Sequence, residues 1–197
     1  FSELHSELGD EFEALDELIR GISAVGEITP RTSDHMASFG EILSSKIITA
    51  ALCAHHIDAE LLDARQCIVT DSVHTRATPL WDEIEQQLRL RVRPLLDQER
   101  VPVMGGFIGA TKSGVTTTIG RGGSDFSAAI VGAGLNAERI QIWTDVDGMM
   151  TTDPNLCGDA RRIKMISFDE AAELAYFGAK VLHPATLLPA IQKHIPV

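Results

Sequence analysis

The sequence has few cysteines and aromatic residues, and no long apolar run. Its three cysteines, Cys53, Cys67 and Cys157, are scattered and form no CxxC pair, which indicates reduced thiols rather than a disulfide framework or a metal cluster. No apolar run approaches the roughly 20 residues of a membrane span. Neither end shows the charged-then-apolar pattern of a signal peptide. We therefore expect a cytoplasmic location and no membrane partner.

Positive charge is also scarce. The chain has 17 Lys and Arg against 28 Asp and Glu, which gives a formal net charge of −11. A protein that binds nucleic acid would carry a basic stripe, so we expect no nucleic-acid partner. Acidic residues crowd positions 3–17, mixed with Leu and Phe at helical spacing. This pattern indicates the solvated face of an amphipathic helix.

The 197 residues suit one domain. Apolar periodicity predicts helices over 1–20, 30–56, 81–96, 124–135 and 168–177, with Gly21 ending the first and the Thr32-Ser33-Asp34 cluster marking the start of the second. Apolar runs predict strands over 59–62, 68–69, 101–105 and 139–143, and turn residues predict loops over 70–79, 105–109, 113–123 and 144–154. Helices that alternate with single strands predict an α/β fold with a mostly parallel sheet.

The strongest local signal is TTTIGRGGSD at 116–125. Glycines let the backbone approach a ligand closely, and N–H groups at a helix start favour an anion. Arg121 offers a two-pronged donor for a carboxylate or phosphate, and Ser124 and Asp125 stand where a helix cap belongs. A plain capped helix with a glycine turn fits the same pattern. Neither GxxxxGK[ST] nor GxGxxG is present, so general rules lead only to an anion site on a helix N-terminus.

Two further segments carry weaker signals. WTDVDGMMTTDP at 143–154 follows an expected strand and contains a polar turn, and open α/β sheets bind ligands at such strand ends. The alternative is a structural turn in which the Asp side chains hydrogen-bond their own backbone. The residue order of an EF-hand calcium loop is missing. FGAKVLHP at 177–184 contains Lys180 at an expected helix end, where a lysine usually complements the helix dipole.

Together these segments resemble the aspartate kinases of the amino-acid kinase superfamily. The similarity also includes ASFGE at 37–41, which resembles the helix that enters the family's substrate pocket, and it runs from about Met36 to the end. It implies a three-layer α/β/α sandwich. It further implies ATP-dependent phosphorylation of the side-chain carboxylate of L-aspartate, the first step toward lysine, threonine and methionine, by a homo-oligomer.

The resemblance also implies roles for individual residues. Glu41 and Arg121 would hold the amino and carboxylate groups of aspartate, and Asp125 would organise a phosphate-binding lysine. The remaining pocket residues would be Phe107, Gly122, Gly123 and Ser124, and the nucleotide residues would be Thr144, Asp145, Met150, Asn155, Lys180 and Val181. Mg²⁺ is expected to arrive through the phosphates of ATP.

The chain departs from the family pattern in several respects. Met150 stands where an aromatic is common, and Asn155 where an Arg is common. The family's opening KFGGTS-like lysine loop and its C-terminal regulatory ACT domains have no counterpart, since Lys46 is expected in mid-helix and Lys112 in a turn. We therefore expect residues 1–197 to be a partial catalytic domain, inactive alone. A related kinase that acts on glutamate and a non-catalytic aspartate- and nucleotide-binding regulatory subunit stay as alternatives.

Overall fold

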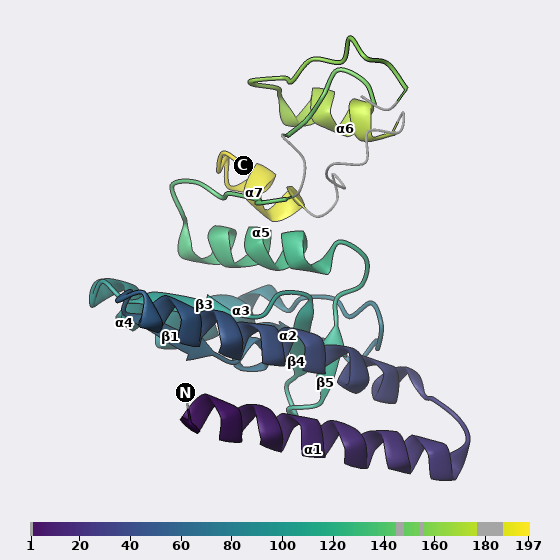
Figure 1. Ribbon diagram of the computed structural model, residues 1–197. Helices are drawn as coiled ribbons and strands as arrows, with labels where there is room; N and C mark the ends of the chain where they lie inside the picture. The colour runs from purple at the N-terminus through teal and green to yellow at the C-terminus, as the bar shows by residue number, and fades with distance from the viewer. Residues whose placement is uncertain (1, 145–147, 154–155, 177–186) are drawn as a thin grey trace. The chain divides into compact units, whose positions relative to one another are not determined.

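The computed structural model describes residues 2–144, 148–153, 156–176 and 187–197 (Figure 1). Contacts between residues divide the chain into two compact units, Phe1–Ser127 and Ala128–Val197. The first unit contains two long helices, a helical segment and five short strands. The α/β class expected from the sequence is confirmed.

The first helix, α1, spans Ser2–Val25 and continues past Gly21. The prediction that Gly21 ends it is wrong, because a glycine inside a helix costs only about 1 kcal/mol and the amphipathic pattern continues. Gly26 ends the helix instead, with φ of 80° and its N–H donated to the carbonyl of Ile22 at 2.8 Å. Glycine adopts this left-handed conformation without a side-chain clash.

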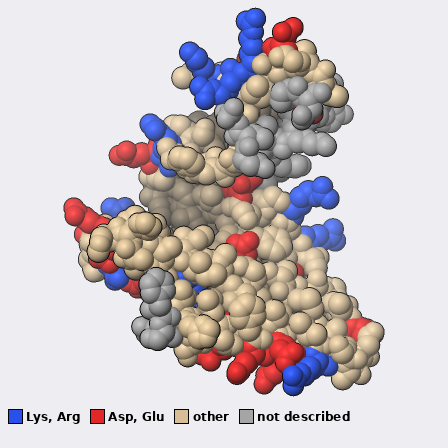
Figure 2. All heavy atoms as spheres, viewed as in Figure 1, with Lys and Arg blue, Asp and Glu red and all other residues tan. Residues whose placement is uncertain are grey.

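The second helix, α2, spans Pro30–Ala54 and lies beside α1 (Figure 1). Thr29 caps it, since its hydroxyl accepts the N–H of Thr32 at 3.1 Å, and Pro30 occupies the first turn. Lys46 on α2 forms a 2.8 Å ion pair with Glu11 on α1. This pair explains why a lysine stands in mid-helix. The exposed acidic side chains of α1 gather along one edge in the view of Figure 2, and they include Glu7, Asp10, Glu13, Asp16 and Glu17.

One helix in the described part of the chain, α2, is long and apolar enough to cross a membrane on length and composition alone. It packs against α1 and against strands of the first unit. It also buries Asp34, Ser38 and Ser45. These contacts are typical of a helix in a folded domain, and the absence of a membrane partner stays a prediction.

The strands of the first unit form two small sheets. β1 (Ala59–Leu62) pairs in parallel with β3 (Val101–Met104). In the second sheet β2 (Val69–Thr70) pairs in parallel with β4 (Ile108–Thr111), and β4 pairs antiparallel with β5 (Thr116–Thr118). The β4–β5 hairpin corrects the expectation of loops over 105–109 and 113–123. Three consecutive β-branched threonines suit a strand, and all three are buried.

The predicted helix at 81–96 is present but irregular. It consists of α3 (Trp81–Gln87), a π-helical segment η2 (Leu88–Val92) and α4 (Arg93–Asp97). Pro94 lacks an N–H and its ring would clash with the preceding turn of a regular α-helix. The wider π turn, which ends at Val92 two residues before Pro94, gives the proline ring room.

The helix α5 (Gly123–Leu135) begins in the first unit and ends in the second, as the small-residue pattern predicted. In the second unit α5 packs against the C-terminal segment, which contains α7 (Leu188–Gln192). The buried cluster comprises Ala129, Ala133, Ile140, Ala190 and Ile195. A side chain at Gly132 would meet Ile140 at 2.6 Å, so the glycine permits this close approach.

The other predictions for the second unit have mixed outcomes. A helix α6 (Phe168–Tyr176) is confirmed, and Ser167 and Glu170 form a reciprocal capping box at its start. The predicted strand at 139–143 is wrong, since these residues join no strand ladder in the described chain. Among the described residues, the one long-range backbone bond of this stretch runs from the N–H of Ile140 to the carbonyl of Pro196 at 2.9 Å, and a proline has no N–H to return.

Candidate functional site

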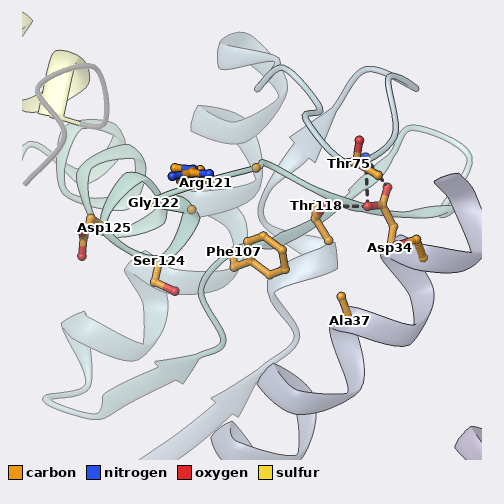
Figure 3. Close-up of a pocket in the computed structure, with 12 residues that line it drawn as sticks. Asp34, Ala37, Thr75, Phe107, Thr118, Arg121, Gly122, Ser124 and Asp125 are labelled. Atoms are coloured by element: carbon orange, nitrogen blue, oxygen red, sulfur yellow. Dashed lines mark hydrogen bonds between the residues drawn. The ribbon is translucent and has the colours of Figure 1, made fainter.

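The first unit contains a pocket of about 490 Å³ between α2, the loop after β2 and the turn that joins β5 to α5 (Figure 3). Its lining residues come from segments far apart in the sequence. They are Ser33, Asp34, Ala37, Thr75, Phe107, Thr118 and the stretch 120–125. The pocket therefore brings together the predicted Phe107, Arg121, Gly122, Gly123, Ser124 and Asp125.

The glycine turn gives the pocket its cation. Gly120 and Gly122 have φ of 84° and 70°, which residues with side chains rarely adopt. The turn closes through a 3.1 Å bond from the N–H of Gly123 to the carbonyl of Gly120. Arg121 is thereby presented at the pocket one turn before α5. An anion at this place would meet both the guanidinium and the N-terminal end of a helix.

Phe107 is held tightly beneath this turn. It has φ of 65°, a strained conformation for an aromatic residue that is typical of functional sites. Its N–H donates to the hydroxyl of Ser127 at 2.9 Å, and its carbonyl accepts the N–H of Ile119 at 3.0 Å. A side chain at Gly123 would lie 2.6 Å from the ring of Phe107. Only glycine fits between the ring and the start of α5.

Glu41 lies on α2 beside the turn that precedes Phe107. Its carboxylate accepts the N–H of Gly106, and burial raises the pKa of that carboxyl. A side chain at Gly105 would meet the Cβ of Glu41 at 3.2 Å, and one at Gly106 would meet the Cα of Ser124 at 3.0 Å. Glu41 thus stands next to the pocket wall without lining the pocket itself. The site offers a cation for a carboxylate and a carboxylate for an ammonium group.

Asp125 occupies the first turn of α5 and also lines the pocket. Burial raises the pKa of its carboxyl. Ser124 precedes it and is exposed. Both residues stand at the helix start, as the motif predicted.

Asp34 was expected only to mark a helix start, but it lines the same pocket. The side chain is 1% exposed, and its carboxylate accepts hydrogen bonds from His74, Thr75 and Thr118. A signal was available, because Asp34 precedes Glu41 by seven residues. That spacing places both carboxylates on one face of α2.

The expected nucleotide residues are only partly described. Thr144 is exposed, and Met150 forms an isolated antiparallel bridge with Arg162 in the second unit. Asp145, Asn155, Lys180 and Val181 lie outside the described residues. In the described ranges no group of three or more His, Cys, Asp or Glu could hold a metal ion. Lys112 forms an ion pair with Glu83, just as Lys46 forms one with Glu11.

The cysteines behave as expected. All three are free thiols, with Cys67 buried and Cys53 and Cys157 exposed. Burial raises the pKa of Cys67 to about 11.

Comparisons with known proteins agree with the motif resemblance. The Amino acid kinase family model matches residues 5–197. Lysine-sensitive aspartokinase 3 of Escherichia coli is 41% identical over 94% of this chain, and chloroplastic aspartokinase 1 of Arabidopsis thaliana is 40% identical over 94%. The chain spans 42% and 33% of these relatives' lengths.

Solved structures give the same result. The crystal structure of E. coli aspartokinase III in complex with aspartate and ADP matches with a TM-score of 0.89 and 40% identity, covering 97% of this chain and 42% of that one. A UMP kinase from Bacillus anthracis shares the fold alone, at 17% identity and a TM-score of 0.54. Since the family model covers nearly every residue, including the whole glycine-turn pocket, the chain belongs to the amino acid kinase family.

Proposed function

We propose that this chain is part of the catalytic domain of an aspartate kinase, which transfers the γ-phosphoryl group of ATP to the side-chain carboxylate of L-aspartate. The observation that carries the proposal is the pocket itself. Arg121 projects from a left-handed glycine turn at the start of α5, together with Ser124 and Phe107, and Glu41 stands beside the same wall. The relatives named aspartokinases support this substrate.

Each charged group has a task in this proposal. The guanidinium of Arg121 binds the α-carboxylate of aspartate in a bidentate pair, while Glu41 attracts the ammonium group. Ser124 and the backbone of Gly122 and Gly123 complete the anion side of the pocket. The side-chain carboxylate of the substrate is left free to react.

The nucleotide side rests on less of the described chain. We propose that Thr144, Asp145, Met150, Asn155, Lys180 and Val181 contact ATP, and that Asp125 orients a phosphate-binding lysine. Mg²⁺ would be held by the nucleotide phosphates and water. The E. coli structure that binds aspartate and ADP supports a nucleotide of this type.

The chemistry requires positioning more than proton transfer. A carboxylate oxygen of aspartate attacks the γ-phosphorus, the bond from that phosphorus to the bridging oxygen breaks, and ADP leaves with the electron pair. The product is 4-phospho-L-aspartate. The acceptor carboxylate is already ionised near neutral pH, so the site needs no general base.

We further propose a place in the cell for this reaction. The acyl phosphate would enter the synthesis of lysine, threonine and methionine, and the enzyme would act in the cytoplasm as a homo-oligomer. Several relatives carry the word chloroplastic in their names, so cell fractionation is the direct test of location. Sedimentation velocity measures the oligomer.

Hydroxylamine trapping of acyl phosphate tests the proposed reaction. The chain as it stands and the full product of its gene are each incubated with Mg-ATP and either aspartate or glutamate. We expect a signal with aspartate only, and little of it from residues 1–197 alone. A glutamate signal would favour the related kinase. Folded protein that binds aspartate without any signal would favour the non-catalytic subunit.

A further inference from the structure

We propose that Asp34 is a positioning residue that fixes the wall of the aspartate pocket and, through it, the turn that carries Arg121. The inference rests on the proposed function for its substrate, but the contacts that carry it stand by themselves. Asp34 belongs to α2, and its side chain points toward Thr75 and Thr118 at the pocket (Figure 3).

The carboxylate of Asp34 is the centre of a buried hydrogen-bond network. Its Oδ1 accepts the hydroxyl of Thr118 at 2.6 Å, and both of its oxygens lie 3.0 Å from the N–H of Thr75. The Nδ1 of His74 lies 2.7 Å from Oδ2. A buried carboxylate is stable only when donors replace its water, and here three residues supply them. Two of these residues, Thr75 and Thr118, line the pocket.

Thr75 shows what the network holds in place. Its φ is 70°, and a β-branched residue in the left-handed region is strained by about 1–3 kcal/mol. Strain of this size persists only where surrounding contacts impose it. The double contact from Asp34 to the N–H of Thr75 is such a contact, because it fixes the orientation of that peptide.

The loop of Thr75 in turn lies against the glycine turn. A side chain at Gly120 would meet the carbonyl oxygen of Thr75 at 3.4 Å and the Cα of Arg76 at 3.6 Å. Ala77, two residues after Thr75, donates its N–H to the carbonyl of Thr118 at 2.8 Å. Asp34 therefore holds two segments next to Gly120: the loop at Thr75 and the end of β5 at Thr118. Arg121 directly follows Gly120 in the sequence.

A positioning role differs from simple support of the fold in what it does to kinetics. Displacing Arg121 by about 1 Å is expected to weaken aspartate binding by up to roughly 100-fold, while the ATP contacts proposed here lie on other residues. We expect Asp34→Ala in the full gene product to raise the aspartate KM about 10- to 100-fold, with the ATP KM changed less than about threefold.

Asp34→Asn is the conservative variant, and it carries the test if Asp34→Ala does not fold. Asparagine keeps an oxygen for Thr118 and Thr75, so its aspartate KM should lie between those of the wild type and Asp34→Ala. Glycine adopts positive φ freely, so adding Thr75→Gly to Asp34→Asn should lower the raised KM. Asp63→Ala is the matched control, since Asp63 also accepts a backbone N–H, from Arg65 at 2.9 Å, in a 3-10 helix (Ala64–Gln66) outside the pocket.

Amide hydrogen exchange separates this inference from the proposed function. Asp34→Asn should speed exchange at residues 75–77 and 118–123, and Asp63→Ala should leave those residues unchanged. If the wild type made no acyl phosphate, the proposed function would fail while exchange still reported on Asp34. A folded Asp34→Asn protein with wild-type exchange in these segments, or with a wild-type aspartate KM in an active enzyme, would overturn the inference.

Discussion

Three carboxylates near the pocket are held in different ways. The carboxylate of Asp34 is enclosed by hydrogen-bond donors. Glu41 accepts one backbone N–H, and Asp125 lies in the first turn of α5. Burial raises the pKa of both of these carboxyls. An enclosed carboxylate supports the structure. The other two stay available to a ligand, and they are the ones to which the motif resemblance assigns roles.

Arg121→Ala should weaken aspartate binding in the active enzyme. Loss of a bidentate charged pair costs about 3 kcal/mol, so we expect a rise in aspartate KM of roughly 100-fold. The ATP KM should change little. Arg121→Lys keeps the charge without the planar fork and should fall between the two. Steady-state kinetics with each substrate varied in turn provides the measurement. An unchanged aspartate KM would show that Arg121 does not bind aspartate.

The acid limb of kcat/KM for aspartate should report Glu41. Burial raises the pKa of this carboxyl, so on acidification it takes up a proton at a higher pH than an ordinary glutamate. Neutral Glu41 attracts an ammonium group less, and kcat/KM should fall as pH drops through that raised pKa. The side-chain carboxyl of the substrate has a lower pKa, about 3.9. Glu41→Gln should lower kcat/KM and remove this limb; an unaltered limb would assign it to another group.

The three thiols should differ in reactivity according to their burial. Cys53 and Cys157 are exposed, while burial raises the pKa of Cys67 to about 11. Because the thiolate is the reactive form, an aromatic disulfide reagent at pH 8 should label two thiols in the folded chain and three in denaturant. Cys67→Ala should leave the native count at two. Fast labelling of three thiols in the folded chain would contradict the buried position of Cys67.

Helices were easier to predict than strands, and the reasons are local. The amphipathic spacing of α1 and the capping box of α6 are readable over a few turns of sequence. The strands β4 and β5 have four and three residues, and their Gly and Thr content is also typical of turns. Their pairing with each other and with β2 makes them strands, and pairing partners are not visible in a short window.

Gly21 in α1 and Gly26 directly after its end should respond oppositely to substitution by alanine. Gly21 lies within the helix with no atom near its missing side chain, so Gly21→Ala should raise the free energy of unfolding by about 0.5–1 kcal/mol. Gly26 has φ of 80°, so Gly26→Ala should lower it by about 1–2 kcal/mol. Urea unfolding of both variants gives the comparison. Equal effects would show that the helix does not end at Gly26.

For the whole molecule, the α/β class and the motif pocket could be predicted from sequence, and the network beneath the pocket could not. Arg121, Ser124 and Asp125 are adjacent in one motif, so their grouping is local. The hydrogen bond between Asp34 and Thr118 cannot be read from the sequence, because only the folded chain brings these two residues together. The prediction of a strand at 139–143 failed for a related reason, because Ile140 and Ile142 pack into or against a buried cluster and pair with no strand in the described part of the chain.

The net charge of −11 should prevent binding to nucleic acid. If the chain bound DNA, the contact would be expected at a local group of exposed basic side chains: Arg161, Arg162 and Lys164. We expect no change in the anisotropy of a labelled DNA duplex at 50 mM salt, at protein concentrations up to about 100 μM, where non-specific binders with Kd of about 10⁻⁴–10⁻⁶ M would register. A saturable rise that weakens with salt and disappears on neutralising the trio would refute the expectation.

The hydrogen bond between Asp34 and Thr118 joins residues 84 positions apart, and this separation matters during synthesis. A ribosome that adds about 5–20 residues per second makes Thr118 roughly 4–17 s after Asp34. Throughout that interval α2 can form and pack on α1, but the carboxylate of Asp34 lacks its hydroxyl donor on Thr118. The pocket that contains Arg121 is therefore assembled late, and a nascent chain that pauses before β5 has α1 and α2 without this site.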